Sequence, residues 1–248
     1  RNVAIGDVAL FNLNPATNVD MHNVAVGHAS GFAMTTGRNN TLVGSNSGNA
    51  LTTANSNTAV GLQALSTDTK GDNSVAIGEN ALLTQNFTTS TDSYNTAVGS
   101  NAGRAVTTGL YNTLIGGLAG DALTDADFNV AVGQNALTVD TLGSKSTAIG
   151  AAALNVQNFT TATDALNTAV GYSAGASVTT GQSNTLIGGL AGDALTTANS
   201  NVAVGGSALT SDTLGARSVA IGQGTLGLQN FTTATNSYNV AVGYAAGD

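Results

Sequence analysis

Residues Asn112–Thr124 read NTLIGGLAGDALT, and the same thirteen residues recur unchanged at Asn184–Thr196, 72 positions further along the 248-residue chain. The segment opens with a pentapeptide of Asn or Ser, Thr or Val, Ala or Leu, Val or Ile, and Gly. This pentapeptide occurs fourteen times, and its closing glycines are Gly6, Gly27, Gly44, Gly61, Gly78, Gly99, Gly116, Gly133, Gly150, Gly171, Gly188, Gly205, Gly222 and Gly243. Successive glycines are 21, 17, 17 and 17 positions apart, and this order then repeats, so the whole pattern recurs every 72 positions. Self-similarity at a short fixed period indicates a repeat architecture.

Every fourth repeat is four residues longer than the others. The longer repeats carry the sequence QNFTT at Gln85–Thr89, Gln157–Thr161 and Gln229–Thr233, and Leu13–Thr17 takes this place in the first copy. We expect these insertions to project as loops, and any contact with a receptor to come from them. The candidate receptor-contact residues are Phe87, Phe159 and Phe231.

A 17-residue repeat with frequent Gly and Asn is too short for a helix–turn–helix unit and fits one coil of a β-solenoid. We therefore predict an all-β fold, a parallel β-roll or β-solenoid of about fourteen coils with 17 or 21 residues each. Each coil is expected to hold two short strands and two turns. We expect residues 1–248 to form a single repeat domain that is a segment of a longer fibre.

The pentapeptide is the first strand of each predicted coil. Because side chains alternate along a strand, its second and fourth residues share one face, and its third residue lies on the other. Both faces are uncharged and mostly apolar, which is typical of a strand buried on both sides. A two-strand coil covers only one side, so we expect a partner chain to cover the other. The fourth-position residues predicted in the core or at an interface are Val26, Val60, Ile77, Val98, Ile115, Val132, Ile149, Val170, Ile187, Val204 and Ile221.

The rest of the coil is less regular in sequence. Polar and β-branched segments such as Ala105–Gly109 and Ala194–Thr197 are predicted to form the second strand, with one face in water. Small residues recur three positions after the pentapeptide glycine, as at Ala81 and Ala102. They indicate a thin roll with little room for large side chains.

Asparagine opens most of the pentapeptides, and Ser74, Ser146 and Ser218 replace it in the units that lead into a QNFTT insertion. If the coils stack in register, these asparagines lie about 4.8 Å apart and can form an amide ladder. The glycine that closes the pentapeptide is expected to permit a positive φ or a close backbone approach. The residues of the predicted ladder are Asn2, Asn23, Asn40, Asn57, Asn95, Asn112, Asn129, Asn167, Asn184, Asn201 and Asn239.

The composition excludes several classes of protein. Only 6 basic and 14 acidic side chains occur, and the formal net charge is −8. Phosphate binding needs clustered Lys and Arg, so we expect no nucleic-acid partner. The chain has no Cys, which excludes disulfides and cysteine-ligated metals. No apolar run approaches the roughly 18 residues that span a bilayer, so we expect no membrane insertion by this segment.

Residues suited to catalysis or metal binding do not recur with the repeats. His22 and His28 are the only histidines, and the aspartates lie in loops, where they favour turns. Gly116–Asp121 and its copy Gly188–Asp193 resemble the calcium-binding repeat Gly-Gly-x-Gly-x-Asp, but Ala119 stands at the fourth position and nothing repeats every nine residues. We therefore predict no enzymatic activity, no metal site and no cofactor.

Units such as Ser74–Ala81 (SVAIGENA) and Ser218–Gly222 (SVAIG) resemble the repeat in YadA-like heads of trimeric autotransporter adhesins. Similar repeats occur in phage tail fibres. The resemblance covers all fourteen units, although each unit is longer than is usual for those heads. It implies a left-handed parallel β-roll, three chains around one axis, and an adhesive or structural role on a cell surface.

The repeats and the resemblance together predict a homotrimeric extracellular fibre or adhesin segment. Such a segment is a rigid rod at a cell surface or on a virion, and its loops face a host-surface receptor. One alternative is the shaft of a phage tail fibre. Another is the monomer of a self-assembling extracellular filament.

Overall fold

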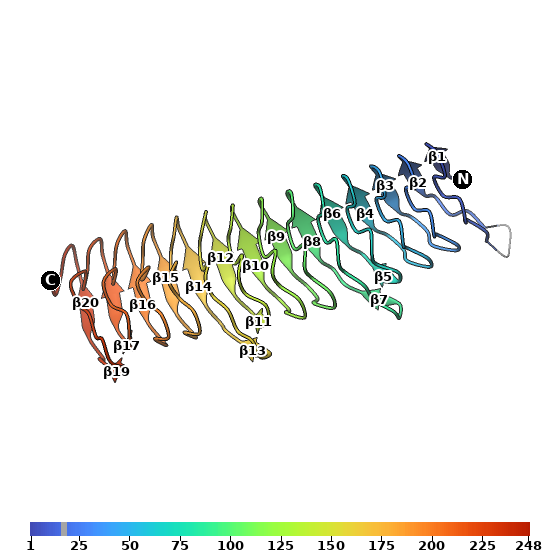
Figure 1. Ribbon diagram of the computed structural model, residues 1–248. Coiled ribbons are helices and arrows are strands. Elements are labelled where there is room, and N and C mark those ends of the chain that lie inside the picture. The colour runs from blue at the N-terminus through green and yellow to red at the C-terminus, as the bar shows by residue number, and fades with distance from the viewer. Residues whose placement is uncertain (16–18) are drawn as a thin grey trace. The chain divides into compact units, whose positions relative to one another are not determined.

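A computed structural model describes residues 1–15 and 19–248 (Figure 1). Part of the Leu13–Thr17 segment therefore lies outside the described residues. The chain forms two compact units, Arg1–Asp125 and Ala126–Asp248. All regular elements in the described ranges are β-strands, and these ranges hold no helix long and apolar enough to cross a membrane.

Seven parallel three-residue strands form the main sheet of the first unit, one from each pentapeptide. In spatial order they are β1 (Val3–Ile5), β2 (Val24–Val26), β3 (Thr41–Val43), β4 (Thr58–Val60), β6 (Val75–Ile77), β8 (Thr96–Val98) and β9 (Thr113–Ile115). The insertion adds a separate parallel pair, β5 (Gly71–Asp72) with β7 (Thr91–Asp92). This pair lies at the far end of the coils from the main-sheet strands (Figure 1).

The second unit has the same organisation. Its main-sheet strands are β10 (Val130–Val132), β12 (Thr147–Ile149), β14 (Thr168–Val170), β15 (Thr185–Ile187), β16 (Val202–Val204), β18 (Val219–Ile221) and β20 (Val240–Val242). Two insertions add two more parallel pairs. These are β11 (Gly143–Ser144) with β13 (Thr163–Asp164), and β17 (Gly215–Ala216) with β19 (Thr235–Asn236).

The strand register follows the sequence period. Thr168 pairs with Thr185 across one of the shorter coils, and Thr147 pairs with Thr168 across one of the longer coils. Each unit is thus a parallel β-solenoid of seven coils. The predicted fold class, an all-β parallel β-solenoid with about fourteen coils, is confirmed.

The third residue of the pentapeptide points into the coil. Ala76 and Ala148 are fully buried there, and so are the leucines that replace alanine, Leu42, Leu114 and Leu186. Aliphatic side chains such as Leu82 and Leu137, which are also fully buried, fill another part of the interior. The narrow interior explains why the strand carries its smallest side chain at this position.

The predicted second strand is wrong for most coils. Ala105–Gly109 and Ala194–Thr197 form turns, bends and irregular backbone, and no strand. The physical reason is left-handed backbone on both sides of each segment, as at Asn101 with a φ of 57° and Tyr111 with a φ of 58°, because such residues cannot continue an extended strand. These segments still stack from coil to coil, since the Thr107 N–H donates to the Thr124 carbonyl at 2.9 Å.

Glycine is required where the pentapeptide ends. Gly99 has a φ of +138°, and a Cβ there would lie 2.5 Å from the carbonyl oxygen of Gly116 in the next coil. Residues with a side chain rarely adopt this φ and cannot approach a carbonyl so closely. The expectation of a positive φ or a close approach is confirmed, and both apply at once.

Candidate functional site

The second and fourth residues of the pentapeptides, which are the first and third of each main-sheet strand, point away from the coil interior, and we call this surface the outer face. The eleven residues predicted at a core or interface position all lie on it: Val26, Val60, Ile77, Val98, Ile115, Val132, Ile149, Val170, Ile187, Val204 and Ile221. In the single chain they are not core residues. The isoleucines remain 38–39% exposed, whereas the alanines on the opposite side of the same strands are fully buried.

The outer face is uniform in chemistry and geometry. In each unit it consists of fourteen side chains, all of them Thr, Val or Ile. The strands are parallel and in register, so identical positions stack, as Ile77 does beside Val98. Seven strands with a spacing of about 4.8 Å extend this surface over about 29 Å in each unit. β-Branched side chains are restricted at χ1, so the shape of the outer face varies little.

Larger side chains border the outer face at the residue before several of the pentapeptides. Tyr94 and Tyr111 are 51% and 44% exposed, and their rings stack with centroids 5.7 Å apart. In the second unit the same position holds Lys145, whose ammonium group contacts the Asp164 carboxylate at 2.6 Å. An apolar centre with an aromatic and polar border is typical of protein interfaces.

The asparagines that open the pentapeptides connect successive coils inside the solenoid. The side-chain oxygen of Asn40 accepts the backbone N–H of Asn57 at 3.0 Å, and the Asn57 oxygen accepts that of Ser74 at 2.8 Å. The Asn57 side-chain nitrogen donates to the Gly71 carbonyl at 2.8 Å. Asn2 and Asn239, in the terminal coils, are exposed. The asparagines buried in the interior are Asn23, Asn40, Asn57, Asn95, Asn112, Asn129, Asn167, Asn184 and Asn201.

A buried polar network replaces asparagine where the pentapeptide opens with serine. The Gln85 side-chain nitrogen donates to Asp68 at 2.6 Å and to the Ser74 hydroxyl at 2.8 Å, and its oxygen accepts from Asn95 at 2.9 Å. Asp68, Ser74, Gln85 and Asn95 are fully buried. The long side chain of Gln85 thus reaches the interior from the insertion and satisfies groups that a serine alone leaves unpaired.

The same network recurs at the other two QNFTT insertions. We call the three equivalent stretches that contain Gln85, Gln157 and Gln229 the first, second and last super-repeat. Its members there are Asp140, Ser146, Gln157 and Asn167, and then Asp212, Ser218, Gln229 and Asn239. Sequence reasoning assigned these aspartates to turns and missed the network. The available signal was the pairing of each Gln with an Asp one coil earlier in the chain, where Ser stands in place of Asn.

The candidate receptor-contact residues require a correction. Phe87 and Phe159 are only 6% and 5% exposed, so their rings are not available at the loop surface. The backbone N–H of Phe87 donates to the buried Asp68 carboxylate at 3.0 Å, which draws the ring into the insertion. Phe231 is partly exposed. The side chains that the insertions do expose are neighbouring hydroxyl residues such as Thr88.

No metal-binding cluster accompanies these features in the described part of the chain. Across residues 1–15 and 19–248, no group of three or more His, Asp or Glu side chains is placed to hold a metal ion. Asp193, in the segment that resembles a calcium-binding repeat, accepts a hydrogen bond from the Thr210 hydroxyl at 2.6 Å. No model of a known protein family and no curated protein matches the chain. The outer face is therefore the candidate functional site.

Proposed function

We propose that the chain is a structural or adhesive segment of a homotrimeric extracellular fibre, in which three copies pack through their outer faces. The observation that carries the proposal is the unbroken row of Thr, Val and Ile side chains that the single chain leaves partly exposed. Soluble monomers rarely expose large contiguous apolar surfaces. Packing against further copies of the chain buries these Thr, Val and Ile side chains in every coil.

The regular repeat suits assembly from identical chains. Because each coil presents nearly the same side chains at the same spacing, a symmetric contact that fits one coil fits the next. The resemblance of the SVAIG units to trimeric adhesin heads supports three copies rather than two. No charged side chain lies on the outer face, so no unpaired charge becomes buried when the copies meet.

A rod of this kind performs its role through stiffness and display. Coil-to-coil hydrogen bonds join backbone and side chains throughout each unit, and the insertions present hydroxyl side chains to the surroundings. The proposed location is a cell surface or a virion, with a host-surface receptor as partner. The proposal includes no enzymatic activity, cofactor, nucleic acid or inserted membrane segment. The shaft of a phage tail fibre is the alternative within the same class, and a filament built from single chains is the alternative outside it.

The native mass of the assembly tests this proposal. We expect light scattering on the 248-residue chain to give three times the chain mass of 24.3 kDa. A folded species with the mass of one chain at micromolar concentration contradicts the proposal. Long filaments seen by electron microscopy favour the self-assembling alternative instead.

A further inference from the structure

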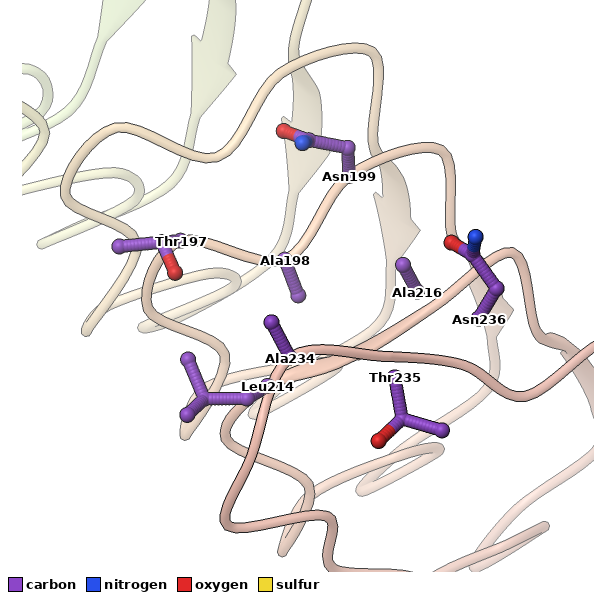
Figure 2. Close-up of a pocket in the computed structure, with 8 residues that line it drawn as sticks. All are labelled: Thr197, Ala198, Asn199, Leu214, Ala216, Ala234, Thr235 and Asn236. Atoms are coloured by element: carbon purple, nitrogen blue, oxygen red, sulfur yellow. The ribbon is translucent and has the colours of Figure 1, made fainter.

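A recess of about 230 Å³ lies in the second unit, between the last insertion and the coil before it. Ala198, Leu214, Ala216 and Ala234 supply its apolar wall, and Figure 2 shows the methyl groups of Ala198 and Ala234 pointing toward one another. Asn199 and residues of β19 contribute polar groups at its border. No charged side chain lines it.

The first super-repeat fills the corresponding place with its own side chains. Asp72 stands where the last super-repeat has Ala216, and it is 7% exposed. Its carboxylate accepts the backbone N–H of Asn55 at 2.5 Å and the Asn55 side-chain nitrogen at 3.3 Å. The other carboxylate oxygen accepts the Ser90 hydroxyl at 2.7 Å. One carboxylate thus bridges the coil and the insertion.

The second super-repeat keeps part of this arrangement. Ser144 occupies the equivalent position, and its hydroxyl oxygen accepts the backbone N–H of Asp127 at 2.9 Å. Both super-repeats therefore supply a side-chain oxygen to the same backbone N–H. The oxygen is carried by β5 in one case and by β11 in the other, the strand of the preceding coil that pairs with the strand after the insertion.

The last super-repeat lacks this oxygen. Ala216 replaces the aspartate, and Ala234 replaces the serine that bonded to it. Among the described residues, the backbone N–H of Asn199 has no acceptor, although the Asn199 side-chain oxygen still accepts the N–H of Gln182 at 2.6 Å. The equivalent N–H groups of Asn55 and Asp127 each bond to a side-chain oxygen. Asn199 is instead exposed beside the alanine-lined recess, where a ligand can reach its N–H.

We propose that this recess binds a small ligand through an acetyl-type group, a carbonyl or carboxylate oxygen next to a methyl. The oxygen takes the place that the Asp72 carboxylate has in the first super-repeat and accepts the Asn199 backbone N–H and side-chain amide. The methyl packs against Ala216 and Ala234. The volume lies below the roughly 300–1,000 Å³ of pockets for drug-sized ligands, which fits a group of this size. An acetylated sugar and free acetate share this chemistry, and the inference does not depend on the proposed fibre.

Nuclear magnetic resonance of the backbone amides tests the site with three probes: N-acetylglucosamine, acetate and glucose. We expect a saturable shift of the Asn199 amide with the first two probes, with a dissociation constant of about 1 mM, and none with glucose. A response to acetate alone supports the site and identifies a carboxylate ligand. The Asn55 amide, which is already bonded to Asp72, is the internal control and should not respond. An Asn199 amide that does not shift, or that shifts equally with glucose, overturns the proposal.

Exchanging residues between super-repeats gives a second, independent measurement. Ala216→Asp copies the first super-repeat and Ala216→Ser copies the second, and we expect each to weaken binding at least tenfold. The double variant Asp72→Ala with Ser90→Ala should open the first recess, so that the Asn55 amide begins to respond. Unchanged binding by a folded Ala216→Asp or Ala216→Ser protein contradicts the assignment.

Discussion

Replacing Ile149 with Asp is expected to convert the native assembly into folded single chains. Ile149 lies on the outer face in β12 and is 38% exposed in the single chain, so the coil itself tolerates a polar side chain there. In the proposed trimer three carboxylates would enter an apolar contact without partners. Burial of an unpaired charge costs several kcal/mol, so we expect assembly to weaken at least 100-fold. Light scattering and circular dichroism measure the two effects separately.

Val156→Asp is the matched control for this variant. Val156 is a β-branched residue with 37% exposure, close to that of Ile149, but it lies in a turn outside the outer face. We expect Val156→Asp to keep both the assembly mass and the β-sheet spectrum of the unchanged chain. An Ile149→Asp protein that retains the full assembly mass shows that the outer face is not the contact surface.

The period of the chain was enough to predict the parallel solenoid. Within each unit the pentapeptide strands pair in parallel, because the sequence repeats at the length of one coil and alternates a small inward residue with two β-branched outward residues. The sequence left open whether residues such as Val98 and Ile115 belong to the core or to an interface. In the structure, alanines such as Ala97 point into the interior and the fourth-position side chains lie outside it.

The other half of the coil was less predictable, because its backbone depends on stacking. Asn101, Leu118 and Leu137 all adopt a positive φ, which local propensity disfavours for leucine. Neighbouring coils impose this conformation by pairing the backbone groups on either side, as in the bond from the Leu118 N–H to the Ser100 carbonyl. Residue preferences alone therefore suggested a strand where the chain forms stacked turns.

The interior of the insertions could not be read from local sequence for a related reason. Asp68 resembles a turn residue beside Lys70 and Gly71, and it does accept the Gly71 N–H at 3.0 Å. Its second role appears only when Gln85, from the next coil, is brought next to it. The burial of Phe87 follows from the same network. The recess beside Ala216 was likewise hidden, because it depends on contrasts between three copies of one structure.

Removal of the Asp140 carboxylate is expected to lower the free energy of unfolding by about 3–5 kcal/mol, because several buried donors lose their acceptor together. Asp140 is fully buried and accepts the Gln157 side-chain nitrogen at 2.6 Å and the backbone N–H groups of Gly143 and Phe159 at 3.0 Å each. In Asp140→Ala the two backbone N–H groups remain inside the coil without a partner, and the Gln157 nitrogen keeps only the Ser146 hydroxyl at 3.0 Å. Each unsatisfied buried donor costs about 1–3 kcal/mol, and limited rearrangement or water entry recovers part of the sum. Denaturant unfolding followed by circular dichroism measures the loss.

Two further variants separate the network from a general effect of removing an aspartate. Asp164→Ala removes an exposed carboxylate that pairs with Lys145, and we expect a loss below about 1 kcal/mol. Asp140→Asn keeps the size and one acceptor oxygen but turns an amide N–H toward other donors, so its loss should fall between those of the two alanine variants. The carboxylate matters because it accepts hydrogen bonds from Gln157 and Phe159 of the insertion and from Gly143 of its own coil at the same time. Surface substitutions usually change the free energy of unfolding by no more than about 0.5 kcal/mol. If Asp140→Ala changes it by no more than that, the network does not hold the insertion in place.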